Sequence, residues 1–311
     1  MSPKRLSDVA KSTTKEHDTT VDFSVLSSLD SSCPIFGALN ISENILLSDE
    51  VFYSKTLSLP AFPMTNPSYK YVPENISIDL LSFYHSKVVK TCKEAIEIER
   101  ETLSQNTECW RKERKMRLTA SNAHDICHST DLPSLPAKLI EKMSKDLSMI
   151  PPIRFGIDKE PMVKNIMRTK FSNHIFRNTG FVIHPLYPFL GSSPDGLLYN
   201  KEDPFLLEVK CIFNPEHLTI EQLTSKRSDF CLEKNEDGLY QLKKTHKYYT
   251  QIQLQMFCTN LTKCLLAVFY DYGKPAILDF IQFDGKFCDA TTQILSSFYF
   301  EHYLRHIHTL H

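Results

Sequence analysis

The chain has 311 residues, of which 41% are hydrophobic, and 36 lysines and arginines stand against 37 aspartates and glutamates. This length suits one catalytic core with an N-terminal extension, and the apolar content is enough to fill that core. The net charge of −1 excludes a protein whose basic surface passively coats nucleic acid. Positive charge that attracts phosphates must therefore be local.

Residues 1–75 are rich in serine, threonine and proline with short apolar patches, so we expect a disordered or loosely packed extension. Residues 76–311 form the expected folded domain. It opens with a predicted helix over 76–105, where apolar residues recur every three to four positions. The remaining expected elements are helices over 119–128 and 136–147, a helix around Glu160, strands over 181–186, 197–199 and 205–211, a helix over 246–256, strands over 265–270 and 276–283, and a helix over 287–306. That order predicts an α/β core with a mixed central sheet flanked by helices.

Nine cysteines without a Cys-x-x-Cys pair indicate reduced thiols in an intracellular compartment, the nucleus if the host is eukaryotic. Potential ligands share a helical face at two places, namely His124 with Cys127 and His128, and His302 with His306. Such groups are far more often packed or exposed than ligating, so zinc is not expected. Without a secretory signal or an apolar run of about 18 residues, the protein is expected to be soluble, with no membrane partner.

Two acids and a lysine distinguish the segment 193–210. Ser-Pro-Asp-Gly at 193–196 indicates a turn, and Leu-Glu-Val-Lys at 207–210 lies in an apolar strand. Because side chains alternate along a strand, Glu208 and Lys210 project from one face and the apolar residues from the other. Asp195 would enter the neighbouring strand of a hairpin, opposite Glu208. Two carboxylates and an ammonium then converge.

Such a convergence can serve phosphate chemistry. Mg²⁺ prefers hard oxygen ligands, so Asp195, Glu208 and the carbonyl of Val209 suffice to hold it against a phosphate. Lys210 would orient the nucleophile and stabilise the developing negative charge, which predicts phosphodiester hydrolysis. The same pattern taken alone fits equally well a surface hairpin whose charges are solvated or paired.

Two helices carry further polar candidates. Glu160 interrupts an apolar stripe that runs from Ile157 to Phe171, which favours a metal ligand or water-binding group. A glutamate near a helix start, stabilised by the helix dipole, explains it equally well. In the helix over 246–256, Tyr248 and Gln251 share a face suited to stacking on or hydrogen-bonding a substrate. A glutamine-rich face is, however, more often exposed to solvent.

Five motifs occur in a recognisable order: Trp110 with a basic run over 111–117 and Leu-Thr-Ala-Ser at 118–121, the Glu160 helix, Ser-Pro-Asp-Gly at 193–196, Leu-Glu-Val-Lys-Cys at 207–211, and Tyr-x-x-Gln-x-Gln at 248–253. Together they resemble the YqaJ and lambda-exonuclease branch of the PD-(D/E)XK nuclease superfamily, over roughly residues 80–305. The basic run alone is more often a solvated helix face.

The resemblance implies a restriction-endonuclease-like core and Mg²⁺, with Mn²⁺ as a substitute. Asp195, Glu208 and the Val209 carbonyl would be the metal ligands, Lys210 the catalytic lysine, and Glu160 a helix acid near the second metal position.

The resemblance also implies a DNA substrate. Gln251 would be an active-site polar group, Tyr248 would contact the substrate, and Arg117 and Ser121 would bind a DNA 5′-phosphate. The expected activity is 5′-to-3′ digestion of linear duplex DNA in recombination or DNA repair. Relatives include homo-oligomers, among them ring-shaped trimers, and a single-strand annealing partner fits the same role.

Two departures from the family concern the loop after the strand. Ile212 follows Cys211 where many relatives place proline, and the segment 214–244 looks long. They keep open a structure-specific endonuclease of the same superfamily. A DNA-binding module without catalysis is the third alternative, but the intact acid, acid and lysine set counts against it, since DNA binding alone requires no buried carboxylates near phosphate.

Overall fold

The computed structural model describes residues 72–73, 75–200, 203–271 and 274–311, all within one unit of the chain. Most of the expected N-terminal extension therefore lies outside the described residues. None of the helices in the described ranges is long and apolar enough to cross a membrane.

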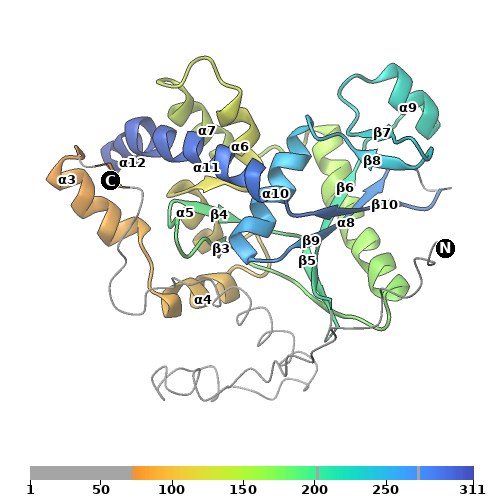
Figure 1. Cartoon of the computed structure of the whole chain (residues 1–311), viewed down its shortest axis with the longest axis horizontal. Helices are drawn as coiled ribbons and strands as arrows, with labels where there is room; N and C mark the ends of the chain where they lie inside the picture. Colours follow the sequence, from red (N-terminus) through yellow and green to blue (C-terminus); the bar gives the residue numbers. More distant parts are fainter. Residues whose placement is uncertain (1–71, 74, 201–202, 272–273) are drawn as a thin grey trace, which may run out of the picture. The chain divides into compact units, whose positions relative to one another are not determined.

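The described chain is mostly helical up to α8, continues with a run of short strands, and ends in helices (Figure 1). The helical elements are α3 (Ile78–Phe83), the π-helical turn η3 (Tyr84–Val88), α4 (Cys92–Glu101), α5 (Glu108–Lys115), α6 (Ala120–Cys127), α7 (Leu135–Ser144), α8 (Pro151–Lys170), α9 (Ile220–Lys226), α10 (Lys247–Thr259), α11 (Gly285–Phe298), η4 (Tyr299–Tyr303) and α12 (Leu304–Thr309). The strands are β1 (Leu118–Thr119), β2 (Ile175–Arg177), β3 (Val182–Ile183), β4 (Leu190–Ser192), β5 (Gly196–Tyr199), β6 (Phe205–Cys211), β7 (Leu232–Lys234), β8 (Tyr240–Leu242), β9 (Lys263–Phe269) and β10 (Ile277–Gln282).

The central sheet has five strands in the order β10-β9-β6-β5-β2. β6 and β9 are parallel, and the other neighbouring pairs are antiparallel. α8 packs on one face, and α10 lies on the other side of the sheet (Figure 1). The predicted mixed sheet flanked by helices is thus confirmed.

The side chains of β6 alternate between two apolar layers. Leu207 and Val209 pack with Val163 of α8, whereas Leu206 belongs to the cluster that contains Ile252 of α10. By the two-residue period, Glu208 lies on the α10 side. The predicted separation of charged and apolar faces is therefore confirmed.

The single helix predicted over 76–105 is wrong. After η3 the chain becomes extended at Val89, with ψ 133°. A new helix begins after Thr91, whose hydroxyl accepts the N–H of Glu94 while the Glu94 carboxylate accepts the N–H of Thr91 at 2.7 Å. This reciprocal capping restarts the helix as α4.

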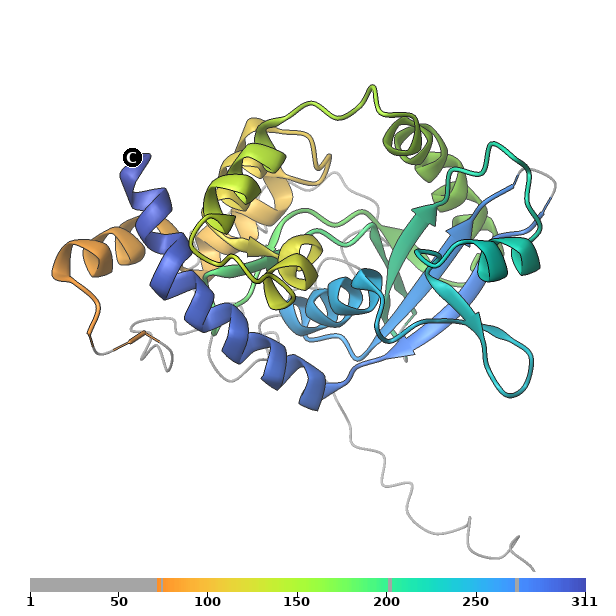
Figure 2. The ribbon, with the colours of Figure 1, turned by 90° about the horizontal axis from the view of Figure 1, so that it is seen from above.

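The long segment 214–244 is folded rather than irregular. It contains α9 and the antiparallel hairpin β7–β8, at the edge of the sheet far from α12 (Figure 2). The N–H of Leu242 donates to the Asp279 carboxylate of β10 at 2.7 Å, which ties the hairpin to the sheet edge.

Candidate active site

Asp195 stands at the start of the β5–β6 hairpin. Gly196 pairs with Leu207, so Asp195 comes opposite Glu208. Its N–H donates to the Leu207 carbonyl at 3.1 Å, and its carboxylate accepts the N–H of Val209 at 2.7 Å. Both backbone and side chain are thereby fixed against the strand that carries the second acid.

Glu208 is only 1% exposed, and three side chains hold its carboxylate. Lys210 Nζ and Gln251 Nε2 each lie 2.5 Å from Oε1, and Gln255 Nε2 donates to Oε2 at 2.8 Å. Gln255 was not predicted from the sequence, although it lies one turn beyond Gln251 on the same helix face. The solvent-exposed alternative for this face is wrong, since Tyr248 and Gln251 are half-buried and Gln251 donates to the Glu208 carboxylate.

The carboxylates of Asp195 and Glu208 repel one another. Burial raises the pKa of Asp195 well above its ordinary value, and the negative charges of Glu208 and Glu160 raise that pKa further. Burial acts to lower the pKa of Lys210, but the charges of Glu208 and Asp195 outweigh it and raise that pKa above its ordinary value. The lysine therefore stays protonated, and Asp195 takes up a proton more readily than an ordinary aspartate, as expected where carboxylates crowd together.

Glu160 lies on α8, where the structure supports neither the apolar stripe nor the helix-start alternative. Its side chain is 38% exposed and forms an ion pair with Lys164 at 2.6 Å, while Ile157 of the supposed apolar stripe is 55% exposed. The helix begins at Pro151, so Glu160 is not a helix-start acid either. It lines the same pocket as Asp195, and its role as a metal ligand or water-binding group stays a prediction.

These groups line a pocket of about 200 Å³. The lining comes from the loop between α4 and α5, from α5, β1, α6, α8, β6 and α10, and from the turn before β5. It comprises Gln105, Arg114, Thr119, Ala120, Ser121, Glu160, Ser193, Asp195, Glu208, Val209, Lys210, Gln251 and Gln255. The structure thus brings together most of the predicted site residues. Arg117 and Tyr248 are not among them.

Arg117 is a structural residue in this fold. Its side chain is 0% exposed, and its guanidinium donates to the carbonyls of Val88, Glu113 and Pro188 and to the Glu113 carboxylate. With its donors engaged by the protein, it has no free face for a DNA phosphate. The expected phosphate-binding role of Arg117 is therefore corrected.

Arg114, one turn earlier on α5, reaches the pocket instead. Its guanidinium lies 4.2 Å from the ring centroid of Trp110 and within 3.5 Å of the Ser121 hydroxyl. Burial lowers the pKa of Arg114 to about 10, so it remains a cation at neutral pH. Trp110 also donates its indole N–H to Ser193 at 2.9 Å. The predicted position of Ser121 at the pocket is retained, with Arg114 beside it.

Tyr248 flanks the pocket from α10. The Nζ atom of Lys210 lies 4.6 Å from its ring centroid. Burial raises the pKa of the Tyr248 phenol, so the ring is neutral at physiological pH. Its aromatic face therefore contacts a catalytic candidate without lining the same pocket.

Residues 109–262 match the family model of the YqaJ-like viral recombinase domain. This part of the chain belongs to that family. All the predicted site residues fall within it, and so do the newly found Arg114 and Gln255. No curated protein matches the chain.

Several solved structures are similar to this chain. They include an alkaline exonuclease from Laribacter hongkongensis (22% identity, 63% of this chain and 92% of that one, TM-score 0.47) and a phage-related exonuclease from Haemophilus somnus 129PT (12%, 63% and 96%, TM-score 0.44). A third is the shutoff and exonuclease protein of Kaposi's sarcoma-associated herpesvirus (14%, 72% and 79%, TM-score 0.41). At these values the likenesses do not determine what this chain acts on.

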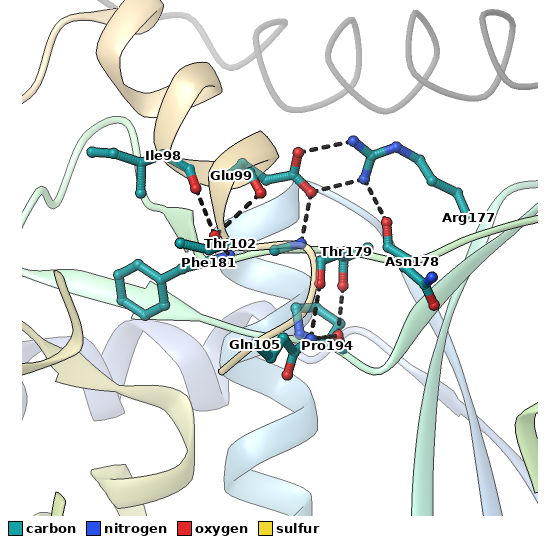
Figure 3. Close-up of polar contacts among 10 residues, drawn as sticks. Ile98, Glu99, Thr102, Gln105, Arg177, Asn178, Thr179, Phe181 and Pro194 are labelled. Carbon is teal, nitrogen blue, oxygen red and sulfur yellow. Dashed lines mark hydrogen bonds and ion pairs between the residues drawn. The ribbon is translucent and has the colours of Figure 1, made fainter. Parts of the chain in front are cut away.

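Gln105, which lies outside the YqaJ-like match, and Thr179, which lies inside it, hold the turn that precedes Asp195 (Figure 3). Gln105 Nε2 donates to the carbonyls of Thr179 and Pro194 at 2.8 and 2.7 Å, and the Thr179 hydroxyl donates to the Pro194 carbonyl at 2.5 Å. Pro194 immediately precedes Asp195. The two donors therefore fix the peptide that presents this acid.

A buried ion pair anchors that arrangement to α4 (Figure 3). Both carboxylate oxygens of Glu99 lie 2.8 Å from the guanidinium of Arg177, and the N–H of Gly180 donates to Glu99 at 2.8 Å. A side chain at Gly180 would place its Cβ 1.8 Å from the Glu99 carbonyl oxygen, so glycine permits this close approach.

The pocket of the YqaJ-like domain suits a hard cation. No three His, Cys, Asp or Glu side chains converge to hold a metal among the described residues, so a metal here needs backbone and water ligands as well. Two features fit it: the crowding of the Glu160, Asp195 and Glu208 carboxyl groups around one pocket, which a cation would relieve, and the buried Gln255 Oε1, which has no hydrogen-bond partner. Asp195, Glu208 and Val209 supply the oxygen donors that Mg²⁺ prefers.

Proposed function

We propose that this domain is a metal-dependent deoxyribonuclease that digests linear duplex DNA from a 5′-phosphorylated end. The observation that carries the proposal is the convergence of Asp195, Glu208 and Lys210 on one pocket whose wall also carries Arg114. A surface hairpin with merely paired charges would not bury Glu208 at 1% exposure or surround it with two glutamine amides.

The chemical roles follow from these positions. Asp195, Glu208 and the Val209 carbonyl would hold Mg²⁺, or Mn²⁺ in its place, which when bound supplies a Lewis acid for water and phosphate. Lys210, aligned by Glu208, donates to the attacking water and to the negative charge that develops on the phosphate. Gln251 and Gln255 hold the Glu208 carboxylate in one orientation.

End recognition is assigned to Arg114 and Ser121. A guanidinium can give a terminal phosphate paired hydrogen bonds that a terminal hydroxyl cannot accept in the same way. Trp110 holds Arg114 in place through its ring and Ser193 through its indole N–H. The phosphate grip is thereby connected to the turn that presents Asp195.

The two carboxylates provide the first test. Asp195→Asn and Glu208→Gln each remove a negative ligand while keeping shape, so Mg²⁺-dependent cleavage of end-labelled linear duplex should fall by at least about 100-fold. DNA binding should persist or tighten, because carboxylate repulsion of phosphate is relieved. Asp203→Asn is the matched control, since Asp203 lies in the same hairpin but pairs with Lys263 outside the pocket. Full activity of both pocket variants would sink the assignment.

The substrate is tested with three DNAs: linear duplex with 5′-phosphate, linear duplex with 5′-hydroxyl, and closed circular duplex. The proposal expects rapid cleavage of the first, slow cleavage of the second and none of the third. Equal cutting of both ends together with nicking of circles would establish the endonuclease alternative. Use in recombination or repair with a single-strand annealing partner, and assembly into a homo-oligomer, belong to the same proposal.

A further inference from the structure

A second pocket, of about 300 Å³, lies next to the catalytic pocket. Its wall combines His124 of α6 and Tyr248 of α10 with Arg227 and Asp229 from the segment 214–244. This is the segment whose length departs from the family pattern. The pocket is therefore built jointly by two site-bearing helices and the part of the chain that is unusual.

The two pockets are displaced by one step along the same pair of helices. On α6, Ser121 lines the catalytic pocket and His124 the second one; on α10, Gln251 lines the catalytic pocket and Tyr248 the second. Three residues of helix correspond to about 4.5 Å. Successive nucleotides of a stacked strand rise by about 3.4 Å and extend further when unstacked. The offset therefore suits neighbouring nucleotides of one strand.

The charges of the second pocket suit a phosphate better than a metal. Its charged lining consists of Arg227 and Lys247 against one carboxylate, Asp229. Arg227 and Asp229 form an ion pair at 2.9 Å, which leaves the exposed Lys247 to set the local charge. The catalytic pocket has the opposite balance, with three carboxylates against two cations.

The ring of Tyr248 lies between the pockets. Lys210, in the catalytic pocket, and Lys247, in the second, lie 4.6 and 5.8 Å from its centroid. Both cations lie over the ring, which therefore holds them at the boundary between the two pockets. A positively charged groove that follows the backbone is a means by which proteins bind single strands without regard to sequence.

We propose that the second pocket binds the next phosphodiester and nucleotide of the strand whose first linkage occupies the catalytic pocket. The inference rests on the proposed nuclease function and deepens it. Lys247 contacts the second linkage, and the Tyr248 ring holds this lysine beside Lys210. The enzyme then acts on a strand at least three nucleotides long that is separated from its complement at the site.

The test uses 5′-phosphorylated oligonucleotides in which one linkage is an uncharged methylphosphonate, at the second or the sixth position. Binding is measured by fluorescence anisotropy with Ca²⁺ in place of Mg²⁺. For the wild-type protein, neutralising the second linkage should raise Kd by about fivefold, and neutralising the sixth should have a much smaller effect.

The lysine variants identify the partner. Lys247→Ala should raise Kd for the unmodified strand by a similar factor. In this variant, neutralising the second linkage should not raise Kd further, because the contact between the lysine and that phosphate is already lost. Lys244→Ala is the matched control, because Lys244 is also exposed and lies three residues away but lines a different pocket. It should respond to the linkages as wild type does.

Four other outcomes are decisive. The second subsite is overturned if neutralising the second linkage raises Kd as much for Lys247→Ala as for wild type. It is also overturned if Lys244→Ala behaves like Lys247→Ala. In both cases cleavage with Mg²⁺ would still support the nuclease function. If the linkage pattern appears without any cleavage in Mg²⁺, the nuclease proposal fails and the strand-binding pocket stands. A wild-type protein that binds no oligonucleotide overturns both.

Discussion

The position of Lys210 shows why arginine should not replace it. Lys210 is 18% exposed, touches Glu208 at 2.5 Å and lies over Tyr248. If its only task were to neutralise the acids, arginine would serve. A lysine that must place a compact ammonium beside the attacking water leaves no room for a planar guanidinium.

Lys210→Arg should therefore fold normally yet lose about 100-fold or more in turnover of linear duplex at saturating Mg²⁺. Thermal unfolding, compared with wild type, confirms that the variant is folded. Near-normal turnover would reject a direct catalytic role for Lys210 and leave it as an ion-pair partner.

Arg114 of α5 and Arg117, which follows this helix, should differ in their roles: the first in binding the DNA end, the second in the stability of the fold. Arg114→Ala should abolish the preference for 5′-phosphate over 5′-hydroxyl ends with little change in unfolding temperature, whereas Arg111→Ala, on the exposed face of the same helix, should change neither. The readout is the ratio of initial rates on the two ends.

Arg117→Ala should act on stability instead. It leaves the buried Glu113 carboxylate without its partner, so the free energy of unfolding should fall by about 3–5 kcal/mol. Chemical denaturation measures this loss. If the Arg117→Ala protein has normal stability but no longer distinguishes the two DNA ends, Arg117 binds the 5′-phosphate, as the sequence predicts.

At the scale of elements, the sequence predicts best where a local pattern determines the outcome. β6 is predicted to the residue because an apolar run with charged residues only at every second position from Glu208 fits a strand period. The helix over 76–105 failed because apolar periodicity continues through Val89, while the capping pair Thr91 and Glu94 restarts the chain.

Contacts between segments that are far apart in the chain could not be predicted from the sequence. Arg114 and Arg117 carry the same side chain in one basic run, and only tertiary packing decides which is buried. Pro194 is held by Gln105 and Thr179, which are 89 and 15 residues away. Short strands such as β1 and β4 also escaped prediction, since two or three residues establish no period.

At the scale of the described unit, the core extends beyond the family match. Tyr84 of η3 and Tyr303 of η4 belong to the same buried cluster as Leu254 of α10. The hydroxyls of Tyr299 and Tyr303 donate to the carbonyls of Met116 and Lys115 at 2.9 Å each. Residues after 262 thus cap the end of α5, the helix that presents Arg114.

Acid sensitivity of the whole fold should arise in part at His184, which is 1% exposed. Its Nδ1 accepts the N–H groups of Leu186 and Tyr187 at 3.0 and 3.1 Å, and its ring packs 4.2 Å from that of Phe257. Burial lowers the pKa of His184 to about 3. The folded protein therefore keeps this imidazole neutral, while the unfolded chain binds a proton near pH 6.5.

Because the unfolded state binds more protons, stability from His184 is present above about pH 6.5 and is lost as the pH falls toward 3. Between pH 7.5 and 5.5 the loss should reach about 1.4 kcal/mol. Urea unfolding of wild type and His184→Gln at both values isolates this contribution: the variant is less stable overall, but its free energy of unfolding should fall by about 1.4 kcal/mol less between the two pH values. Equal pH dependence of the two proteins would show that His184 takes up its proton without unfolding.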